Sequence, residues 1–411
     1  MIHRPLIALA DPEWIGHRET YFREFVLSLN RVGADVIALC PDPSQLAHLG
    51  LGASSLHCET LVEPQRLPLL RRLFQDPVNT HLRWRFLKRA LHKAEVKAGR
   101  PADFLFFPWL DSYLRVSLSE KIASGQVKTP WAGLYFRPNH LVDEHQKLRS
   151  SSLLQSTAKG DALLRSRNCR AVAVLDETMR TALEATSRKP VILFPDITDE
   201  SAPDPETPFA KQILQRAKGR KIIGLIGMEP RKGVITMLKA AEIAAEKSLP
   251  WLFVLAGAAC WSQYSPGEQR YIEECIKNSR DVSSGGNLLF PDEFKPIADG
   301  PAYNGVLDTF DVLFIAYHDF LGSSNVLTKS SILKKPVVST DPGCIGHRTK
   351  VHQLGLTIPQ GDAQACVGAI EKLLQGVDWN DRLLEPQHAE YHSRHSRDAL
   401  DRCMKSLIDL I

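Results

Sequence analysis

The sequence lacks the short motifs that identify many nucleotide-binding and metal-binding proteins. No GxGxxG follows the first strand expected in either half, and no GxxxxGK[ST] occurs, which excludes the dinucleotide fingerprint and the P-loop. The eight cysteines form no CxxC pair and show no zinc spacing, so reduced thiols in a cytoplasmic protein are expected. No DxD-type acidic pair is obvious, and we expect neither a bound metal nor a cofactor.

Long apolar runs and a strong excess of one charge are also missing. No hydrophobic stretch approaches the roughly 20 residues that a membrane-spanning helix needs. The apolar residues 5–10 are too few for a signal peptide and run directly into Asp11. With 51 Lys and Arg against 47 Asp and Glu, the net charge of +4 gives no reason to expect a nucleic-acid partner.

What the chain does have is a regular alternation of strand and helix signals over 411 residues, a length that favours two domains. The expected strands are short, continuous apolar runs, which is typical of parallel sheets covered by helices on both faces. Apolar residues at helical spacing between them predict helices such as 234–247 and 269–278. The strands are expected at 5–10, 35–40, 103–108, 131–136, 171–175, 191–195, 221–227, 251–257, 287–290, 311–317, 336–340 and 354–358.

A stretch rich in proline and acids, residues 195–210, interrupts this alternation and is interpreted as an interdomain linker. The sequence therefore predicts an N-terminal domain at 1–195, a linker at 196–219, a C-terminal domain at 220–395 and a closing helix at 396–411. The expected fold class is α/β, with two Rossmann-like, doubly wound parallel-sheet domains that face a cleft.

A basic turn opens the second half, in the sequence "GLIGMEPRKGVITM". Gly227 ends a strand, and Arg231 and Lys232 stand where the next helix begins. Two cations beside the N–H groups of a helix terminus favour a diphosphate. The alternative is a solvated basic turn before an amphipathic helix, and the sequence leaves both interpretations open.

A polar loop, residues 317–325, follows a later strand at its carboxyl end, where open parallel sheets bind ligands. The N–H groups of Ser323, Ser324 and Asn325 would favour a diphosphate at the start of the next helix. Alternatively, Ser323 or Ser324 is a simple helix cap. Lys329, in that helix, can only donate hydrogen bonds, so it is expected to reach a phosphate or to point to solvent.

Taken in order, these segments resemble the GT-B glycosyltransferases, most closely the retaining, nucleotide-sugar-dependent family 4. The segments "IGMEPRKG", "WLFVLAG", "FDVLFIAYHDFLG", "KKPVVSTDPGCIGH" and "LGLTIPQGD" are similar to its donor domain. The segment "IGHRETYFREFVLSLNRVGADVIALCP" is similar to the opening of its acceptor domain, and "AEYHSRHSRDALDRCMKSLI" to its closing helices. The resemblance spans nearly the whole chain and implies an acceptor-side N-terminal domain and a donor-binding C-terminal domain.

In that family, the loop matching residues 317–325 carries two glutamates with seven residues between them. The first contacts the transferred sugar and the second binds the ribose. Alignment on Gly322 puts Asp319 and Leu327 at these positions, whereas alignment on Pro336 puts Leu321 and Lys329 there. The second acid is missing in both registers, and we expect Asp319 to replace the first. The alternative role for Asp319 is to cap the following turn.

The residues themselves, together with the resemblance, give the following candidate site residues. The catalytic set is His17, Asp319, Arg231 and Lys232, with a helix cap as the alternative role of His17. The acceptor-binding set, taken from two strand ends, is Asp111, Arg137 and His140, of which His140 has a structural alternative. The donor-binding set is Gly16, Gly227, Met228, Gly322, Ser323, Ser324, Asn325, Val326 and Lys329.

One strongly basic segment, residues 65–100, contains Asp76 and Glu95 as its only acids and interleaves Trp84 and Leu87 with basic residues. Such a helix can lie on an anionic membrane surface. It can equally be a solvated helix that packs its apolar side on the N-terminal domain. The expected location is thus cytoplasmic, with contact to the inner membrane face left open.

The expected function is transfer of a sugar from a UDP-, GDP- or ADP-linked donor to an acceptor hydroxyl. Family resemblance implies a retaining, metal-independent, hexosyltransferase-like enzyme in polysaccharide, glycolipid or natural-product assembly. Because the second glutamate is missing, a non-catalytic GT-B protein that binds a sugar or a partner subunit is an alternative. A nucleotide-sugar epimerase on the same fold is another.

Overall fold

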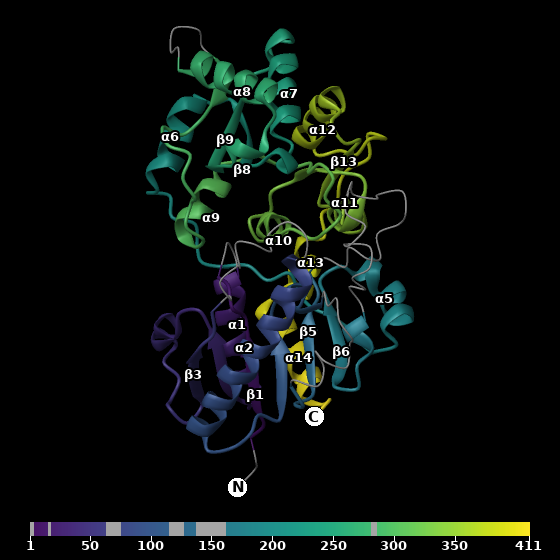
Figure 1. The fold of residues 1–411 in the computed structure, drawn as a ribbon. Helices are drawn as coiled ribbons and strands as arrows, with labels where there is room; N and C mark the ends of the chain where they lie inside the picture. The colour runs from purple at the N-terminus through teal and green to yellow at the C-terminus, as the bar shows by residue number, and fades with distance from the viewer. Residues whose placement is uncertain (1–3, 15–17, 63–74, 115–126, 137–161, 281–285) are drawn as a thin grey trace. The chain divides into compact units, whose positions relative to one another are not determined.

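The computed structural model describes residues 4–14, 18–62, 75–114, 127–136, 162–280 and 286–411. The chain divides into two compact units, which are described separately (Figure 1). Unit 1 contains Met1–Ile197 and His395–Ile411, and unit 2 contains Thr198–Arg394. Within the described part of the chain, no helix combines the length and hydropathy needed to span a bilayer.

Unit 1 is built on a seven-stranded sheet in the order β3-β2-β1-β4-β5-β6-β7, in which every neighbouring pair is parallel. All the strands expected from apolar runs are present. β3 was not expected, because "LHCET" is only half-buried at the sheet edge and shows no apolar run. The strands are β1 (Leu6–Ala10), β2 (Asp35–Cys40), β3 (Leu56–Thr60), β4 (Phe104–Phe107), β5 (Trp131–Leu134), β6 (Cys169–Val174) and β7 (Val191–Leu193).

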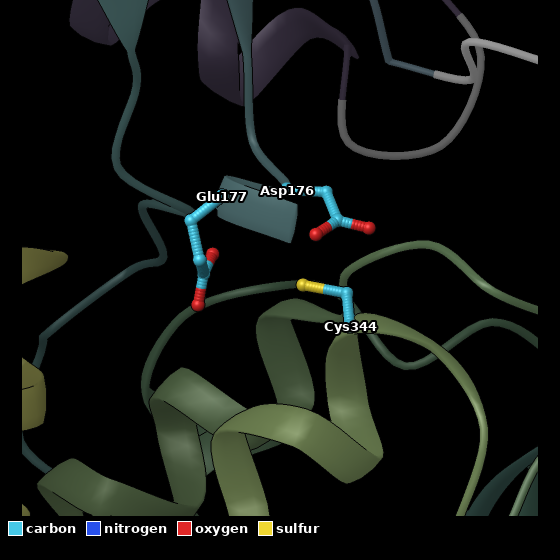
Figure 2. Close-up of side chains that lie close together, drawn as sticks. All are labelled: Asp176, Glu177 and Cys344. Carbon is cyan, nitrogen blue, oxygen red and sulfur yellow. The ribbon is translucent and has the colours of Figure 1, made fainter. Parts of the chain in front are cut away.

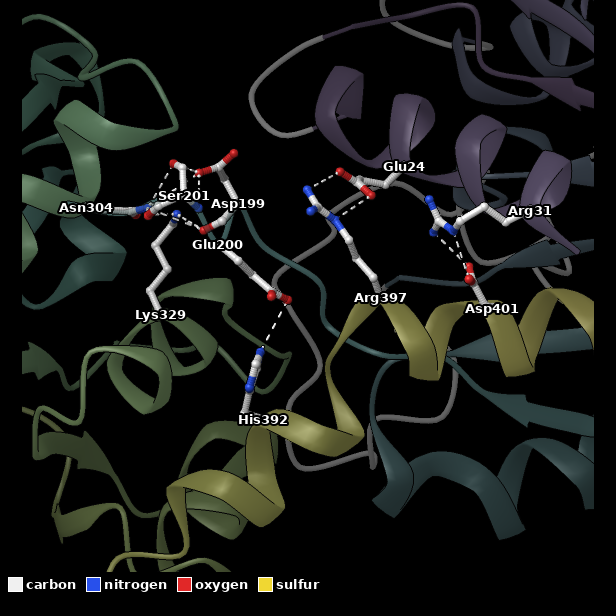
Figure 3. Close-up of polar contacts among 10 residues, drawn as sticks. All are labelled: Glu24, Arg31, Asp199, Glu200, Ser201, Asn304, Lys329, His392, Arg397 and Asp401. Atoms are coloured by element: carbon white, nitrogen blue, oxygen red, sulfur yellow. Dashed lines mark hydrogen bonds and ion pairs between the residues drawn. The ribbon is translucent and has the colours of Figure 1, made fainter. Parts of the chain in front are cut away.

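Helices cover both faces of this sheet. Alternate residues of its strands belong to two separate buried clusters, one with α2 (Gln75–Ala98) and the other with α1 (Arg18–Arg31) and α14 (Arg397–Ile408). Bidentate ion pairs fasten α14 to α1, with Arg397 on Glu24 and Arg31 on Asp401 at 2.7–3.0 Å (Figure 3). The other helical segments are η1 (Pro43–Leu49), α3 (Asp111–Leu114), η4 (Ala162–Arg165), η5 (Glu177–Met179) and α5 (Arg180–Ser187).

The basic segment contributes its apolar side to this core. In α2, Trp84 and Leu87 are fully buried, and the indole N–H of Trp84 donates to the carbonyl of Tyr113. Arg85 and Lys88 are exposed on the opposite side. This is the packing expected of a solvated helix face. In α2, attraction to an anionic surface would therefore rest on the exposed charges. Residues 65–74 of this segment lie outside the described residues.

Unit 2 is built on a six-stranded parallel sheet in the order β10-β9-β8-β11-β12-β13. Every strand expected in this part of the chain is present. The strands are β8 (Lys221–Met228), β9 (Trp251–Ala259), β10 (Leu288–Leu289), β11 (Val312–Ile315), β12 (Val337–Thr340) and β13 (Gly355–Ile358). The two sheets confirm the α/β class with two doubly wound parallel-sheet units.

Two buried clusters again lie on the two faces of the unit 2 sheet. One includes α6 (Pro208–Ala217), although the linker expected from composition, 196–219, contains this segment. Its Ala210, Ile213 and Ala217 are buried, so it is part of the unit. The remaining helical segments are η6 (Pro230–Lys232), α7 (Val234–Glu246), η7 (Trp261–Gln263), α8 (Pro266–Ser279), α9 (Pro301–Asp308), α10 (Asn325–Ile332), α11 (Gly343–Val351), α12 (Ala363–Gln375) and α13 (His388–Arg394). All eight cysteines of the chain are free thiols.

Candidate functional site

The candidate site of unit 2 starts at the carboxyl end of β8, where the strand is irregular. Pairing of β8 with β9 shifts register between Ile226 and Met228, and Gly227 has φ +95°. A Cβ on Gly227 would lie 3.5 Å from Cε of Lys232. A side chain at this position would therefore need the left-handed conformation, although its Cβ would only contact the lysine. The glycine allows the backbone to turn into η6.

Arg231, in η6, is held from two sides. Its Nε donates to Oε2 of Glu229 at 2.7 Å, and its guanidinium carbon lies 5.2 Å from the ring centroid of Phe320. The side chain is 37% exposed. One acid therefore offsets part of the charge of Arg231, and the guanidinium has further N–H groups besides the Nε–H that Glu229 accepts.

Lys232 is held by a phenol instead of an acid. Its Nζ donates to the hydroxyl of Tyr317 at 2.7 Å and lies 4.3 Å from the centroid of the same ring. The Tyr317 hydroxyl lies 3.2 Å from Oγ of Ser324, in the segment that leads into α10. Because neither neighbour is charged, this arrangement fixes the ammonium near the start of α10 without neutralising it.

The start of α10 lacks the usual side-chain cap. Ser324 occupies the N-cap position with extended backbone, but its side chain makes no capping hydrogen bond, and its hydroxyl meets Tyr317 instead. Oγ of Ser323 accepts from Nη1 of the buried Arg348 at 3.4 Å. The partial positive charge of the helix N-terminus is thus added to that of Lys232. The neutral capping role expected as an alternative for Ser324 is not seen.

The loop between β11 and α10 is tied to η6 and to α11. The N–H of His318 donates to the carbonyl of Arg231 at 2.8 Å, and its Nε2 lies 2.8 Å from Oγ1 of Thr236. Desolvation lowers the pKa of His318, so the neutral ring is favoured. On the other side, the backbone N–H of Cys344 donates to the carbonyl of Leu321 at 2.9 Å. The side chain of Cys344 is drawn in Figure 2. The loop is therefore fixed at both ends.

Asp319 lies at the exposed tip of this loop in a left-handed conformation, with φ +47°. Gln360 binds it twice: Oε1 accepts from the Asp319 N–H at 2.9 Å, and Nε2 donates to Oδ1 at 3.1 Å. In the described part of the chain, Asp319 makes no capping hydrogen bond to the following helix, whose N-cap position is occupied by Ser324. Left-handed Asp residues are uncommon, and such outliers motivate a functional hypothesis.

Lys329 is buried rather than directed to solvent, with 1% of its side chain exposed. Its Nζ donates to Oδ1 of Asn304 at 2.7 Å and to the carbonyl of Asp199 at 3.0 Å (Figure 3). It also lies 2.9 Å from Oδ1 of Asp299. An ammonium has three hydrogens, and these three acceptors use them. The donor-binding role expected for Lys329 is thus not supported by its contacts.

The carboxyl edge of the unit 1 sheet has a different composition. Arg18 contacts Oδ1 of the buried Asp11 at 3.2 Å and Oε2 of Glu13 at 3.1 Å, and it lies 4.4 Å from the Trp109 ring centroid. Asp111, expected to bind an acceptor, accepts from the N–H of Phe136 at 2.9 Å.

After β6, Asp176 is the N-cap of η5, the short helical turn that begins at Glu177 (Figure 2). Its carboxylate accepts from the N–H of Thr178. Asp111 and Asp176 thus both secure backbone segments that follow strand ends of this sheet.

Several sequence-based expectations can now be placed. Arg231, Lys232, Gly227 and the 322–325 segment lie together at one edge of unit 2. The side chains of Met228 and Val326 are buried in the two cores of that unit, so neither can reach a ligand except through its backbone. Gly16, His17, Arg137 and His140 lie outside the described residues.

Sequence reasoning missed the residues that hold the cations in place. These are Tyr317, His318, Thr236, Gln360 and Arg348. Tyr317 resembles the last residue of an apolar strand, and nothing local marks its hydroxyl as a partner of Lys232. The one available signal was its position at the carboxyl end of a parallel strand.

No protein-family model matches the sequence, and no curated protein sequence matches it. Solved structures match its fold along the whole chain. Sucrose-phosphate synthase from Thermosynechococcus elongatus is 18% identical, with a TM-score of 0.66 over 99% of this chain and 98% of the other. Anabaena Alr3699/HepE in complex with UDP-glucose is 15% identical, with a TM-score of 0.60 over 100% of both chains.

The E. coli trehalose-6-phosphate protein bound with UDP-2-fluoro glucose is 11% identical, with a TM-score of 0.64 over 99% of this chain and 98% of the other. At such identities the likeness shows the fold alone. This chain has the GT-B glycosyltransferase fold, as the order of its motifs predicts.

Proposed function

We propose that this protein is a glycosyltransferase that binds the diphosphate of a nucleotide sugar at the carboxyl edge of unit 2. The observation that carries this proposal is the placement of Lys232. The Tyr317 hydroxyl holds its ammonium at 2.7 Å and itself lies 3.2 Å from Ser324, which leads into α10. This contact holds the ammonium in one position, whereas a solvated lysine would move among many. The GT-B fold and the UDP-glucose complex of Alr3699/HepE support the assignment.

The expected chemistry is stabilisation of charge on a leaving nucleoside diphosphate. When the bond between sugar and phosphate breaks, negative charge grows on the phosphate oxygens. Preorganised donors near those oxygens lower the barrier because they need no reorganisation. Lys232, Arg231 and the N-terminus of α10 are such donors in this proposal. The departing phosphate would then take the proton of the acceptor hydroxyl, and the outcome would be retention at the sugar carbon.

Asp319 is proposed to act on the transferred sugar. Its carboxylate is at the exposed tip of the loop that leads to Ser324 and is oriented by Gln360. A carboxylate there can accept hydrogen bonds from sugar hydroxyls, which the cations of η6 cannot do. The contact of Asp319 with the sugar and that of the α10 N-terminus with the diphosphate would thus come from one continuous loop, and η6 would add Lys232 and Arg231.

A ligand panel tests this function directly. The purified full-length protein would be titrated calorimetrically with UDP, GDP, ADP and their glucose conjugates, and donor hydrolysis would be followed in parallel. Binding of at least one diphosphate and turnover of its sugar conjugate are expected. If no member of the panel binds, the assignment of the phosphate site is wrong.

The position of Lys329 favours one second candidate, a GT-B protein that binds a nucleotide sugar without turning it over. The acid expected at this position of the loop pattern is replaced by a buried lysine. Turnover separates the two candidates. Tight binding of a nucleotide sugar with no hydrolysis, and no transfer to a panel of sugar and lipid acceptors, would support the non-catalytic protein.

A further inference from the structure

The start of β6 places an exposed arginine inside the unit 1 sheet. β6 lies between β5 and β7, and all of its residues except Arg170 are buried. A β-bulge accounts for the exception, because Trp131 of β5 pairs with Cys169 and Ala132 pairs with Ala171, which leaves Arg170 without a partner on β5. Bulges are rare between parallel strands, and they redirect a side chain. The amino end of this sheet therefore presents a cation to solvent.

Two more cations lie beside Arg170. β6 and β7 pair in register from Val172 and Val191. Arg170 and Lys189 each come two residues earlier, so they are neighbours at the starts of the two strands. Arg188 directly precedes Lys189 and is the C-cap of α5.

Hydrogen bonds bring a third segment to the same edge. The N–H of Trp131 donates to the carbonyl of Asn168 at 2.7 Å, and Nδ2 of Asn168 donates to the carbonyl of Val127 at 3.0 Å. Arg167 directly precedes Asn168, and Lys128 directly follows Val127. The starts of three adjacent strands thus supply five cations. The name amino-edge patch is used below for Lys128, Arg167, Arg170, Arg188 and Lys189.

The contacts of these cations leave their charge unopposed. Four of the five are exposed, and their side chains make no ion pair or hydrogen bond with the described residues. Nζ of the fifth, Lys189, donates to the carbonyl of Ser166 at 3.0 Å. A helix C-terminus favours a nearby cation, which accounts for Arg188 at the end of α5 but not for the cations at the starts of β5 and β6.

The acids of the neighbouring segments have other partners. Asp103, at the start of β4, pairs with Arg100 at 3.6 Å, and Glu184 of α5 pairs with Arg180 at 3.0 Å. The amino-edge patch therefore attracts anions, and three of its members are arginines, whose planar forks bind two oxygens of a carboxylate or sulfate.

The openness of the patch indicates an extended ligand. Small molecules bind where a concave site encloses most of their surface, whereas these side chains are mostly exposed. An extended chain with several anionic groups can instead contact cations from three strand starts at once. Neighbouring strands lie about 4.8 Å apart, so the patch crosses two such spacings.

The lack of apolar anchors narrows the class of this chain. No large hydrophobic side chain is exposed in residues 127–130, 162–170 or 186–190. Membrane insertion, base stacking and the central contacts of a protein interface all use such side chains. An acidic saccharide requires none of them, because its charged groups and hydroxyls lie on its outside.

We propose that the amino-edge patch binds a linear acidic polysaccharide through carboxylate or sulfate groups, with the chain crossing the starts of β5, β6 and β7. The anion site itself does not depend on the nucleotide site of unit 2. The choice of a saccharide among polyanions does rest on the proposed function, because a glycosyltransferase meets saccharide chains as acceptors or products.

Calorimetric titration of the purified full-length protein at low salt tests this site. The acidic probes are decagalacturonate and a heparin-derived decasaccharide, and neutral maltodecaose is the uncharged control. Polyglutamate of similar length, a short DNA duplex and phosphatidylglycerol vesicles represent the other classes of partner. We expect at least one acidic saccharide to bind more tightly than all three of these, and maltodecaose not to bind.

The patch variant combines Arg167→Gln, Arg170→Gln and Arg188→Gly. Gly suits the left-handed backbone of Arg188, at φ +56°, and Gln is tolerated at the two exposed positions. Urea unfolding should therefore show unchanged stability, while the affinity for the acidic saccharide should fall about tenfold or more. If the triple variant does not fold, Arg188→Gly alone decides the test, with an expected loss of about two- to fivefold.

Two controls remove the same charge elsewhere. The first combines Arg85→Gln, Lys88→Gln and Arg89→Gln, which are exposed positions of α2 in the same unit. The second is Lys218→Gly, because Lys218 is also an exposed, left-handed C-cap, that of α6 in unit 2. Both controls should bind the acidic saccharide as the wild type does.

Equal losses in the patch variant and the α2 control would show attraction by general charge and would overturn this inference. Tighter binding of polyglutamate, duplex DNA or vesicles would assign the patch to another class of partner and would overturn it as well. If neither acidic saccharide binds, the inference is wrong, while binding of UDP, GDP or ADP would still support the proposed function. Patch-dependent saccharide binding without binding of any of these diphosphates would reject the proposed function and leave this inference standing.

Discussion

At the carboxyl edges of the two sheets, Arg18 and Lys232 are held by different kinds of group. In unit 1, Arg18 lies within 3.2 Å of carboxylate oxygens from both Asp11 and Glu13. In unit 2, Lys232 rests on the hydroxyl and ring of Tyr317. Two acids cancel the charge of an arginine, whereas a neutral phenol orients a lysine and leaves its charge in place. Both edges therefore have a basic residue, and what differs is whether the groups that contact Arg18 and Lys232 are charged.

This comparison shows why counting basic residues at strand ends is a weak guide to anion binding. Both units have a cation beside an aromatic ring at the same edge of the same kind of sheet. Lys232, which has no paired acid, attracts a phosphate more strongly than Arg18, which has two, or Arg231, which has Glu229. The following predictions test that difference, beginning with the largest expected effect.

Lys232→Met should weaken nucleoside diphosphate binding most. The substitution removes a charge-assisted contact of about 1.5–3 kcal/mol, which is roughly a ten- to hundredfold change in affinity. The exposed Lys239 on α7 provides a matched control, and Lys239→Met should bind as the wild type does. Calorimetric titration gives both affinities. If both variants lost the same affinity, binding would depend only on the net charge of the protein. The position of Lys232 would then not explain why unit 2 binds the diphosphate.

Asp319→Asn should lower turnover about tenfold or more while leaving nucleoside diphosphate affinity unchanged. Asn keeps the oxygen that accepts from Gln360, and it tolerates the left-handed backbone as well as Asp does. The fold is therefore preserved, and only the negative charge beside the sugar is lost. The measurements are steady-state kinetics with the preferred donor and titration with the free diphosphate. Unimpaired turnover would show that Asp319 does not contact the sugar.

Arg18→Met should affect the stability of unit 1 and leave diphosphate binding unchanged. It removes the cation that offsets Asp11, a residue only 1% exposed, at a cost of about 1–3 kcal/mol. Urea unfolding followed by tryptophan fluorescence would measure the loss, and calorimetry the affinity. Arg23→Met is the control, because Arg23 forms an exposed pair with Glu19. A marked drop in diphosphate affinity in Arg18→Met would contradict the assignment of the phosphates to unit 2 alone.

Much of the fold was predictable because a buried parallel strand must be apolar at nearly every position. β3 was not predicted because it is a half-buried edge strand without an apolar run. α6 was assigned to the linker because the prolines and acids before it dominate the local composition. Arg231 and Lys232 were recognisable from the turn that contains them. Their environment was not, because it comes from distant parts of the chain.

Lys232 and its partner Tyr317 are 85 residues apart, and Lys329 meets a carbonyl 130 residues away. No local pattern shows whether a lysine in a helix turns inward. In this molecule Lys329 turns inward because Asp299, Asn304 and Asp199 together satisfy it. Site residues can thus be predicted as types at strand ends, whereas the pairing that decides their charge state and direction has to be seen in the structure.

The smallest predicted effect concerns pH and His318, which joins the β11–α10 loop to α7 through Thr236. Desolvation lowers its pKa below the ordinary 6.5 of an unfolded chain. Between that lowered value and 6.5 the unfolded state binds more protons, so His318 makes folding less favourable as the pH falls through this window. The loss is complete once the pH lies below the lowered pKa of His318.

His318→Gln keeps an amide near Thr236 but cannot titrate. Its urea midpoint should therefore fall less than that of the wild type between about pH 7.5 and pH 5.5, although its stability at the higher pH is similar or slightly lower. Some slope should remain in the variant, because desolvation also lowers the pKa of His81 and His388. Identical pH dependence in both proteins would mean that His318 titrates alike in the folded and unfolded states. The loop would then be open to water at the point where it is tied to η6.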